Sequence, residues 1–217
     1  MNKKADYAKL VLKRREFKFS SGLLNPSQIE NGIYDQNDHI GPWSAWQGNL
    51  DAKIFLIGQD WGNKKYYIDN GGSDLDDNTS NRNLIELFNV LEIDIGSPNT
   101  QNQTFPLFFT NAILGIKEGD MSRNVSKSWA RESTNAFLDP LLKLINPQII
   151  ITLGKVAYDE IAYLYSLPKY PLKSLIKQNP IALHDSKRLF AMYHCGRLGL
   201  ANRNLILQKR DWKKIEL

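Results

Sequence analysis

The stretch KIFLIGQDWGNKK, Lys53 to Lys65, decides how the chain is interpreted. Its apolar residues Ile54–Ile57 are typical of a buried strand, and they run directly into Gly58. A glutamine, an aspartate and a tryptophan then stand between Gly58 and Gly62. Glycines let the backbone turn sharply and approach a ligand. The stretch therefore predicts a core strand that presents Asp60 at its carboxyl end.

Further apolar runs along the chain predict three more buried strands, at Leu107–Phe109, Ile149–Leu153 and Leu189–Tyr193. Segments with helical spacing lie between them, at residues 81–91, 128–145 and 155–165. Strands that alternate with helices indicate a parallel sheet covered on both faces. With the right-handed crossover rule, this predicts an α/β fold, a three-layer α/β/α sandwich with a central four-stranded parallel sheet. Pro140 predicts a kink or two short helices in its segment.

The composition indicates one globular domain over all 217 residues, with 42% hydrophobic and 24% charged residues. No apolar run is long enough for a membrane span, and the N-terminus has no apolar signal region, so a cytoplasmic location is expected. The net charge of +5, with basic residues crowded at both ends, favours a polyanionic partner or marks solvated helix faces. Residues 1–50 are expected to form a helical lid extension, with Trp43 and Trp46 as core anchors. The acidic stretch 69–78 is expected to be a flexible surface loop.

Several kinds of site are excluded. Cys195 is the only cysteine, so an intrachain disulfide, a four-cysteine iron–sulfur cluster and a cysteine zinc site cannot form. A pairing of Cys195 with His194 is disfavoured, because neighbours on a strand point to opposite faces. No metal site is predicted, since the three histidines lack ligand spacing. The glycine-rich turn also lacks the Gly-Lys-Ser/Thr ending of a phosphate loop.

Polar groups follow the predicted strands at their carboxyl ends, where ligands bind in parallel sheets. These groups are Asp60, Asn111 and His194, which follow three of the four strands. Each has a structural alternative. Asp60 could cap the following helix, Asn111 could hold a turn, and His194 could be a satisfied core histidine. Their convergence on one sheet edge favours a common site.

These residues resemble the uracil-DNA glycosylase superfamily. IGQDWG, residues 57–62, looks like its first motif, which reads GQDPYH in family 1 enzymes. LFFTNAILGIK, residues 107–117, is similar to the second-strand segment, and residues 139–161 are similar to the stretch around the third strand. MYHCGRLGLANRN, residues 192–204, takes the place of the motif that usually begins His-Pro-Ser. The likeness covers roughly residues 53–214.

The resemblance implies a DNA glycosylase that removes uracil or a related deaminated base, with DNA as partner and no cofactor. Such enzymes move the target base out of the stack into a pocket. Asp60 would position water and stabilise cationic sugar character, while Asn111 would read the uracil edge. His194 would donate toward uracil O2 as negative charge develops. The implied base-binding set is Gly58, Gln59, Trp61, Gly62, Asn111, Tyr66 and Tyr67.

The chain departs from the family pattern at several positions. Gly62 replaces the tyrosine that blocks the thymine methyl in family 1, and Trp61 stands where proline is usual. Tyr66 or Tyr67 would substitute for the stacking phenylalanine. The loop after His194 differs, so Arg197 or Leu198 would be the DNA wedge. The expected DNA contacts are Arg197, Leu198, Lys155 and Arg203.

A monofunctional, monomeric enzyme is expected, because no lysine stands at the motif positions and strand cleavage needs an amine nucleophile. Lys64 and Lys65 are the nearest exceptions in sequence. Two alternatives remain open. One is a catalytically altered or inactive glycosylase-fold protein that binds nucleic acid or nucleotides. The other is an unrelated α/β enzyme that acts on a small molecule, and absence of salt-sensitive oligonucleotide binding would identify it.

Overall fold

A computed structural model describes residues 2–35, 38–121 and 123–217. Within them, a sheet of five strands has the order β3-β2-β5-β7-β6. The strands are β2 (Ile54–Gly58), β3 (Leu107–Asn111), β5 (Ile149–Leu153), β6 (Ile181–Ala182) and β7 (Arg188–Met192). The strands β3, β2, β5 and β7 pair in parallel, and β6 pairs antiparallel with β7 at the sheet edge.

The prediction of a four-stranded sheet was wrong by this edge strand. β6 has two residues, both at least partly exposed, so the sequence carries no apolar run to reveal it. The four predicted strands form the parallel part of the sheet, with each end within two residues of its predicted place. Their continuous burial follows from a sheet that is covered on both faces.

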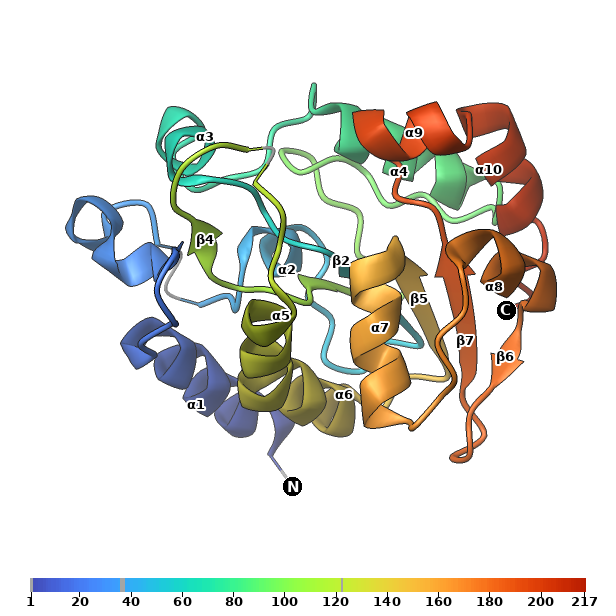
Figure 1. The fold of residues 1–217 in the computed structure, drawn as a ribbon, viewed down its shortest axis with the longest axis horizontal. Coiled ribbons are helices and arrows are strands. Elements are labelled where there is room, and N and C mark those ends of the chain that lie inside the picture. The colour runs from blue at the N-terminus through green and yellow to red at the C-terminus, as the bar shows by residue number, and fades with distance from the viewer. Residues whose placement is uncertain (1, 36–37, 122) are drawn as a thin grey trace.

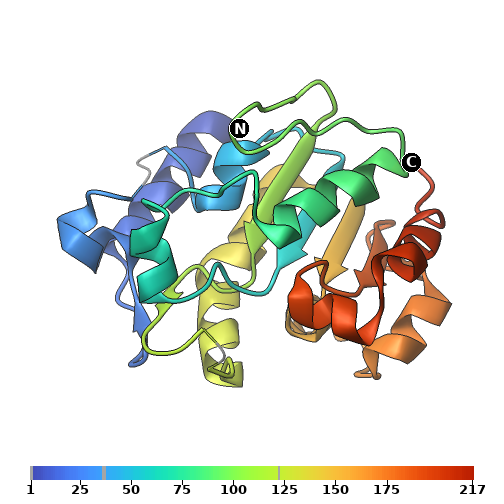
Figure 2. The ribbon, with the colours of Figure 1, turned by 90° about the horizontal axis from the view of Figure 1, so that it is seen from above.

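Helices cover both faces of the sheet (Figures 1 and 2). Side chains alternate along β2, so Phe55 and Ile57 join one hydrophobic core while Ile54 and Leu56 join the other. The first core is closed by α1 (Lys3–Glu16), α6 (Asp139–Ile145), α7 (Lys155–Leu164) and α8 (Leu172–Gln178). The second is closed by α2 (Pro42–Trp46), α4 (Thr79–Asn89) and α10 (Leu205–Trp212).

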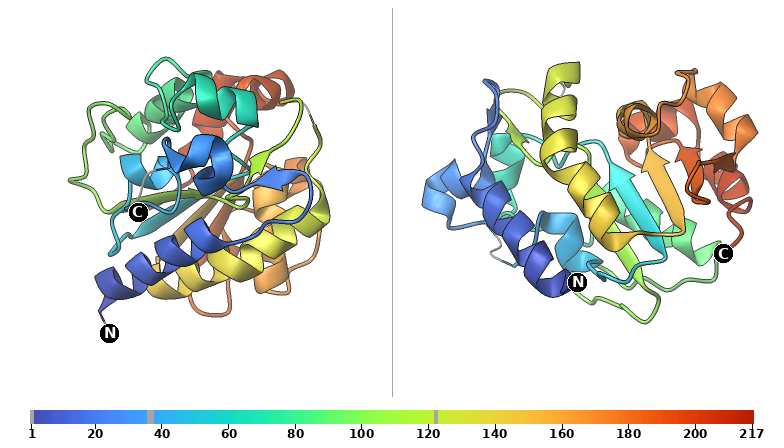
Figure 3. Two further views of the ribbon diagram at one scale, coloured as in Figure 1. Left: turned by 90° about the vertical axis from the view of Figure 1, so that its left-hand side faces the viewer. Right: turned by 90° about the horizontal axis from the view of Figure 1, so that it is seen from below.

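The helical segment around Pro140 is divided, as its proline predicted. α5 (Lys127–Ser133) passes through a π-helical turn, Thr134–Leu138, into α6. Pro140 lies in the first turn of α6, where a missing backbone N–H costs least. The result is a pair of short helices that run along one face of the sheet beside α1 (Figure 3).

The N-terminal segment packs on this body. α1 is followed by β1 (Leu23–Leu24), a 3₁₀ segment (Pro26–Gly32) and α2. β1 pairs antiparallel with β4 (Ile116–Lys117) in a second, small sheet. Trp43 and Trp46 are buried core residues, as expected, and the Trp46 indole N–H donates to the Ile95 carbonyl at 2.9 Å.

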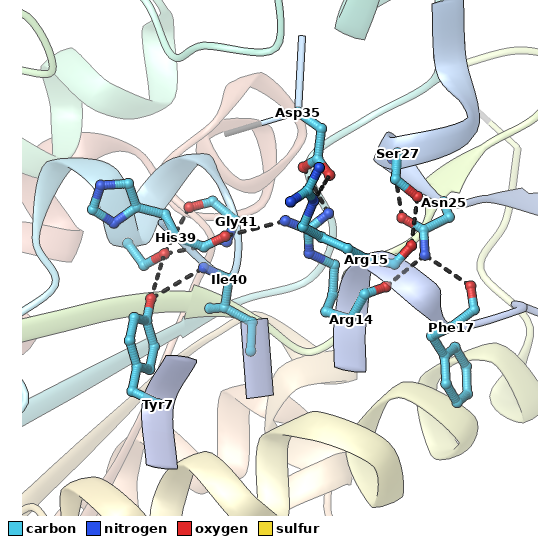
Figure 4. A network of polar contacts seen from close by, with 11 residues as sticks. Tyr7, Arg14, Arg15, Phe17, Asn25, Ser27, Asp35, His39, Ile40 and Gly41 are labelled. Atoms are coloured by element: carbon cyan, nitrogen blue, oxygen red, sulfur yellow. Dashed lines mark hydrogen bonds and ion pairs between the residues drawn. The ribbon is translucent and has the colours of Figure 1, made fainter. Parts of the chain in front are cut away.

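A network of polar contacts fixes this segment in place (Figure 4). The buried Arg14 guanidinium lies 2.6 Å from Asp35 Oδ1 and also donates to the His39 carbonyl at 3.1 Å. The Tyr7 hydroxyl accepts a hydrogen bond from the Ile40 N–H at 3.0 Å.

Two remaining short helices are α3 (Lys64–Asp69) and α9 (Arg197–Asn202). Throughout the described residues, every helix is too short or too polar to span a bilayer.

Candidate functional site

The predicted site residues meet at the carboxyl ends of the strands that carry them, because these strands are parallel. Asn111 is the last residue of β3 and pairs in register with Gly58, the last residue of β2. Asp60 follows two residues after β2, and His194 two residues after β7. Helices α4 and α9 lie at this end of the strands (Figure 1). The convergence expected from the sequence is therefore present.

Gly58 is required by the close approach of its neighbours. A Cβ atom at Gly58 would lie 2.4 Å from Asn111 Oδ1 and 2.8 Å from the ring of Trp43. Any larger residue would push the Asn111 amide out of its buried position, where the residue is 6% exposed. The glycine thus fixes the amide against the strand end.

Asp60 is held by two side chains. Gln59 Nε2 donates to Asp60 Oδ2 at 2.7 Å, and Lys117 Nζ lies 3.3 Å from Asp60 Oδ1. The Asp60 and Lys117 side chains are 6% and 5% exposed, so this is a buried ion pair. Lys117 also donates to the Met121 carbonyl at 3.0 Å. Sequence reasoning missed Lys117, although a lysine that closes the apolar run NAILGIK is an unusual feature.

His194 is in the neutral form with its proton on Nε2. Its Nδ1 accepts a hydrogen bond from the Gly196 N–H at 2.9 Å, which leaves Nε2 as the donor. Lost hydration lowers the pKa of His194, while the nearby negative charge of Asp60 acts in the opposite direction. The site therefore presents an imidazole N–H donor without a positive charge.

The loop that carries His194 is tied to α4 and α10. Asn83 Nδ2 donates to the Cys195 carbonyl at 2.7 Å, and Gln208 Nε2 donates to the His194 carbonyl at 3.2 Å. The Cys195 thiol is buried against the Ser80 carbonyl, 3.3 Å from its Sγ. Burial raises the pKa of Cys195 to about 12, which keeps it protonated and unreactive.

The aromatic residues after Asp60 form a cluster. The Trp61 ring centroid lies 5.1 Å from that of Tyr66 and 5.4 Å from that of Tyr67. Trp61 Nε1 donates to Asp74 Oδ2 at 3.1 Å. Asp74 is buried, so the expectation of a flexible surface loop over residues 69–78 was wrong at its centre. Tyr67 is covered by its neighbours, and Tyr66 is half-buried, so neither presents an open stacking face.

Gly62 leaves room that other side chains fill. Its φ of +131° is one that glycine tolerates, and a Cβ atom there would lie 3.2 Å from both Met121 Cε and Tyr66 Cδ1. Asn63 Nδ2 donates to the Gly119 carbonyl at 2.7 Å, which fixes the loop that brings Met121. The space beside Gly62 is thus filled by the side chains of Met121 and Tyr66.

A small cavity lies beside this cluster. Its volume is about 20 Å³, and it is bordered by Asn111, Trp43, Trp61, Tyr67 and the Arg14–Asp35 pair. A space of that size holds about one water molecule. A pyrimidine ring fits only if the surrounding side chains move. The N-terminal segment therefore borders this cavity, and its role as a lid stays a prediction.

The expected DNA contacts fall into two groups. Arg197 and Leu198 are exposed at the start of α9, next to the His194 loop, and Leu198 is 83% exposed. Arg203 instead donates to Asp211 through two nitrogens, and Lys155 pairs with Asp159 on the same helix. Arg197 and Leu198 are thus free to meet a ligand, whereas Arg203 and Lys155 already form ion pairs with side chains of α10 and α7.

Comparison with known proteins adds no relative: no protein-family model and no curated protein matches this chain. The resemblance to uracil-DNA glycosylases stays a prediction from the motifs. Over the described residues, no group of three or more His, Cys, Asp and Glu side chains could hold a metal ion. The functional proposal therefore depends on the side chains at the sheet edge.

Proposed function

We propose that the protein is a DNA glycosylase with a single uracil-DNA glycosylase-like domain. It would hydrolyse the N-glycosidic bond of uracil or a related deaminated base. The observation that carries this proposal is the meeting of a buried carboxylate, a fixed amide and a neutral imidazole donor at the carboxyl ends of the parallel strands. Asp60, Asn111 and His194 supply these groups in the order that the motifs predict.

The chemistry assigns a different part of the substrate to each group. The Asn111 amide can donate and accept at once, which suits the O4 and N3–H edge of uracil. His194 Nε2–H would donate to the base oxygen on which negative charge develops as the glycosidic bond breaks. A preorganised donor of this kind contributes about 3–4 kcal/mol to such a step. Asp60 would act on the sugar side, where the bond is cleaved.

A second candidate function is binding of nucleic acid or nucleotides without base release. It is favoured by the closed site: both oxygens of Asp60 are engaged, and the adjoining cavity has a volume of about 20 Å³. In that case Asp60 would be a structural ion-pair partner. The two candidates differ in whether free base is released.

The test uses labelled oligonucleotides that carry one uracil, as a single strand, opposite guanine and opposite adenine. Hot alkali after incubation converts any abasic site into a cut. We expect the wild type to produce cuts and Asp60→Asn to produce roughly 100-fold fewer. The matched control is Asp51→Asn, an exposed carboxylate that precedes the same strand at its other end.

Each result separates the candidates. Equal cutting by Asp60→Asn and the wild type would remove Asp60 from the chemistry. Salt-sensitive binding without cutting of uracil, hypoxanthine or xanthine substrates would favour the second candidate. Absence of both would contradict a nucleic-acid function.

A further inference from the structure

Hydrolysis by water gives the Lys117 amine no chemical step beyond its ion pair with Asp60. Lys117 is 4% exposed, and β4 brings it to Asp60 from 57 positions further along the chain. Its Nζ contacts are Asp60 Oδ1 and the Met121 carbonyl. Burying two charges costs desolvation, and an apolar pair of similar size is often as stable. Stability alone therefore gives little reason for an amine at this place.

The charge of the pair also matters for the reaction. A carboxylate stabilises a cationic sugar through its negative charge, and an ammonium group 3.3 Å away largely cancels that charge. Asp60 Oδ1 is also a carboxylate oxygen that can accept a proton from Nζ as the amine reacts. That transfer produces an unprotonated amine, which is the nucleophilic form of lysine.

We infer that Lys117 is an amine nucleophile that reacts with the abasic sugar and cleaves the DNA strand. The inference rests on the proposed function, because an abasic site is the product of base release. Asp60 takes one proton from Nζ, and the Nζ lone pair then forms a bond to the aldehyde carbon C1′. One Nζ proton passes to the aldehyde oxygen and Asp60 returns the proton that it took, so the oxygen leaves as water and a protonated imine remains.

The protonated imine draws electrons from C2′, so the ionised Asp60 carboxylate takes a C2′ proton and the C3′–O bond to the 3′ phosphate breaks. The phosphate leaves with the electron pair, and water later releases Lys117. The expectation of a monofunctional enzyme assumed that no lysine reaches the site. The structure removes this premise, since Lys117 lies against Asp60. Rotation of its flexible side chain away from Met121 would bring Nζ to the sugar.

The test supplies the abasic site ready-made, in an oligonucleotide prepared beforehand, so that it does not depend on base release. Borohydride adds hydride to C1′ of an imine and turns it into a stable secondary amine. We expect the wild type to form a covalent protein–DNA adduct, with Lys117 as the attached residue in peptide mass spectra. Lys117→Arg keeps the ion pair but cannot form the imine, so the adduct should be lost.

Lys65→Arg is the matched control, because Lys65 is an exposed lysine in the segment after Asp60, and its adduct should equal that of the wild type. No adduct with the wild type, an adduct retained in Lys117→Arg, or attachment at another lysine would each overturn the inference. An adduct at Lys117 without release of any base would support this inference while contradicting the proposed base release. Uracil release without an adduct would do the reverse.

Discussion

At the scale of single residues, Asp74 is a buried carboxyl group that holds Trp61 in place. Its oxygens accept hydrogen bonds from Trp61 Nε1 at 3.1 Å and from Asn81 Nδ2 at 3.2 Å. Burial raises the pKa of Asp74 to about 6, and the two hydrogen bonds oppose that rise without cancelling it. Since Trp61 follows Asp60 directly, the protonation of Asp74 bears on the residues around the site.

This raised pKa predicts a pH-dependent stability. The folded protein holds the Asp74 proton more tightly than the unfolded chain, so the group favours folding most below pH 4. That contribution is lost as the pH rises through 6, because the buried group must then ionise. A rise of the pKa from 3.8 to about 6 corresponds to about 3 kcal/mol. Relative to Asp74→Asn, the wild type should therefore lose about that much unfolding free energy between pH 4 and pH 8.

Urea unfolding at the two pH values measures the difference, because effects of other carboxylates cancel between wild type and variant. Asp69→Asn is the control, since Asp69 lies near Asp74 in sequence but its side chain is exposed. Parallel pH dependences for the wild type and Asp74→Asn would show that Asp74 ionises in the folded protein at no cost.

At the scale of elements, α9 positions the His194 loop through a close backbone contact. Gly199 lies in this helix, and a Cβ atom there would be 1.7 Å from the His194 carbonyl oxygen. The same carbonyl accepts a hydrogen bond from Gln208 on α10. The two helices thus fix the backbone of His194, and the Gly196 N–H fixes its ring.

Gly199→Ala should move His194 and lower both activity and stability. A displacement of about 1 Å in a catalytic group costs roughly 100-fold in rate. The crowding itself costs about 1–3 kcal/mol of unfolding free energy. Base release on uracil-containing DNA and thermal unfolding measure the two effects. Gly41→Ala is the control, because its Cβ atom would meet only Leu114, at 3.7 Å. Unchanged activity in a folded Gly199→Ala protein would show that the loop adapts.

Elements with a strong sequence pattern were predictable, and those defined by tertiary pairing were not. The parallel strands are continuous apolar runs, and Pro140 marked the division between α5 and α6. β4 is two residues long and exists because it pairs with β1. Lys117 enters the site on β4, so motif order predicted Asp60, Asn111 and His194 but not the amine beside them. A side chain that is placed by a two-residue strand pairing between distant segments cannot be predicted from the local sequence pattern.

At the scale of the whole molecule, one buried ion pair joins the N-terminal helix to the pocket region. Arg14 on α1 and Asp35 have side chains that are 2% and 3% exposed. Without Arg14, the buried Asp35 keeps only Arg15 as an ion-pair partner, at 3.3 Å from its Oδ2, so the loss lies at the lower end of the roughly 3–5 kcal/mol of an uncompensated buried charge. Arg14→Met should therefore lower the unfolding free energy by about that amount. Chemical denaturation measures it.

Lys9→Met is the control on the same helix. Lys9 pairs with Asp6 at the surface, with its side chain 77% exposed, so the change should stay within about 0.5 kcal/mol. Equal small effects of the two substitutions would mean that α1 does not depend on the buried pair.

The distribution of charge over the molecule predicts where DNA would lie under the proposed function. The net charge is +5, but a basic side chain at the amino ends of the strands cannot meet phosphates that lie near Asp60. Arg197 is exposed beside the His194 loop, whereas Lys143 lies in the last turn of α6, at the edge where β5 begins. Arg197→Gln should weaken oligonucleotide binding and reduce the slope of log K against log salt by about 1.

Lys143→Gln should leave that slope unchanged. Fluorescence anisotropy titrations at several salt concentrations give both slopes. The comparison works because each released counterion reflects one phosphate contact, whatever the sequence of the oligonucleotide. If Lys143→Gln lowered the slope and Arg197→Gln did not, the nucleic acid would lie at the opposite edge of the sheet. Asp60, Asn111 and His194 could then not reach a base in that complex, and their convergence would need another substrate to explain it.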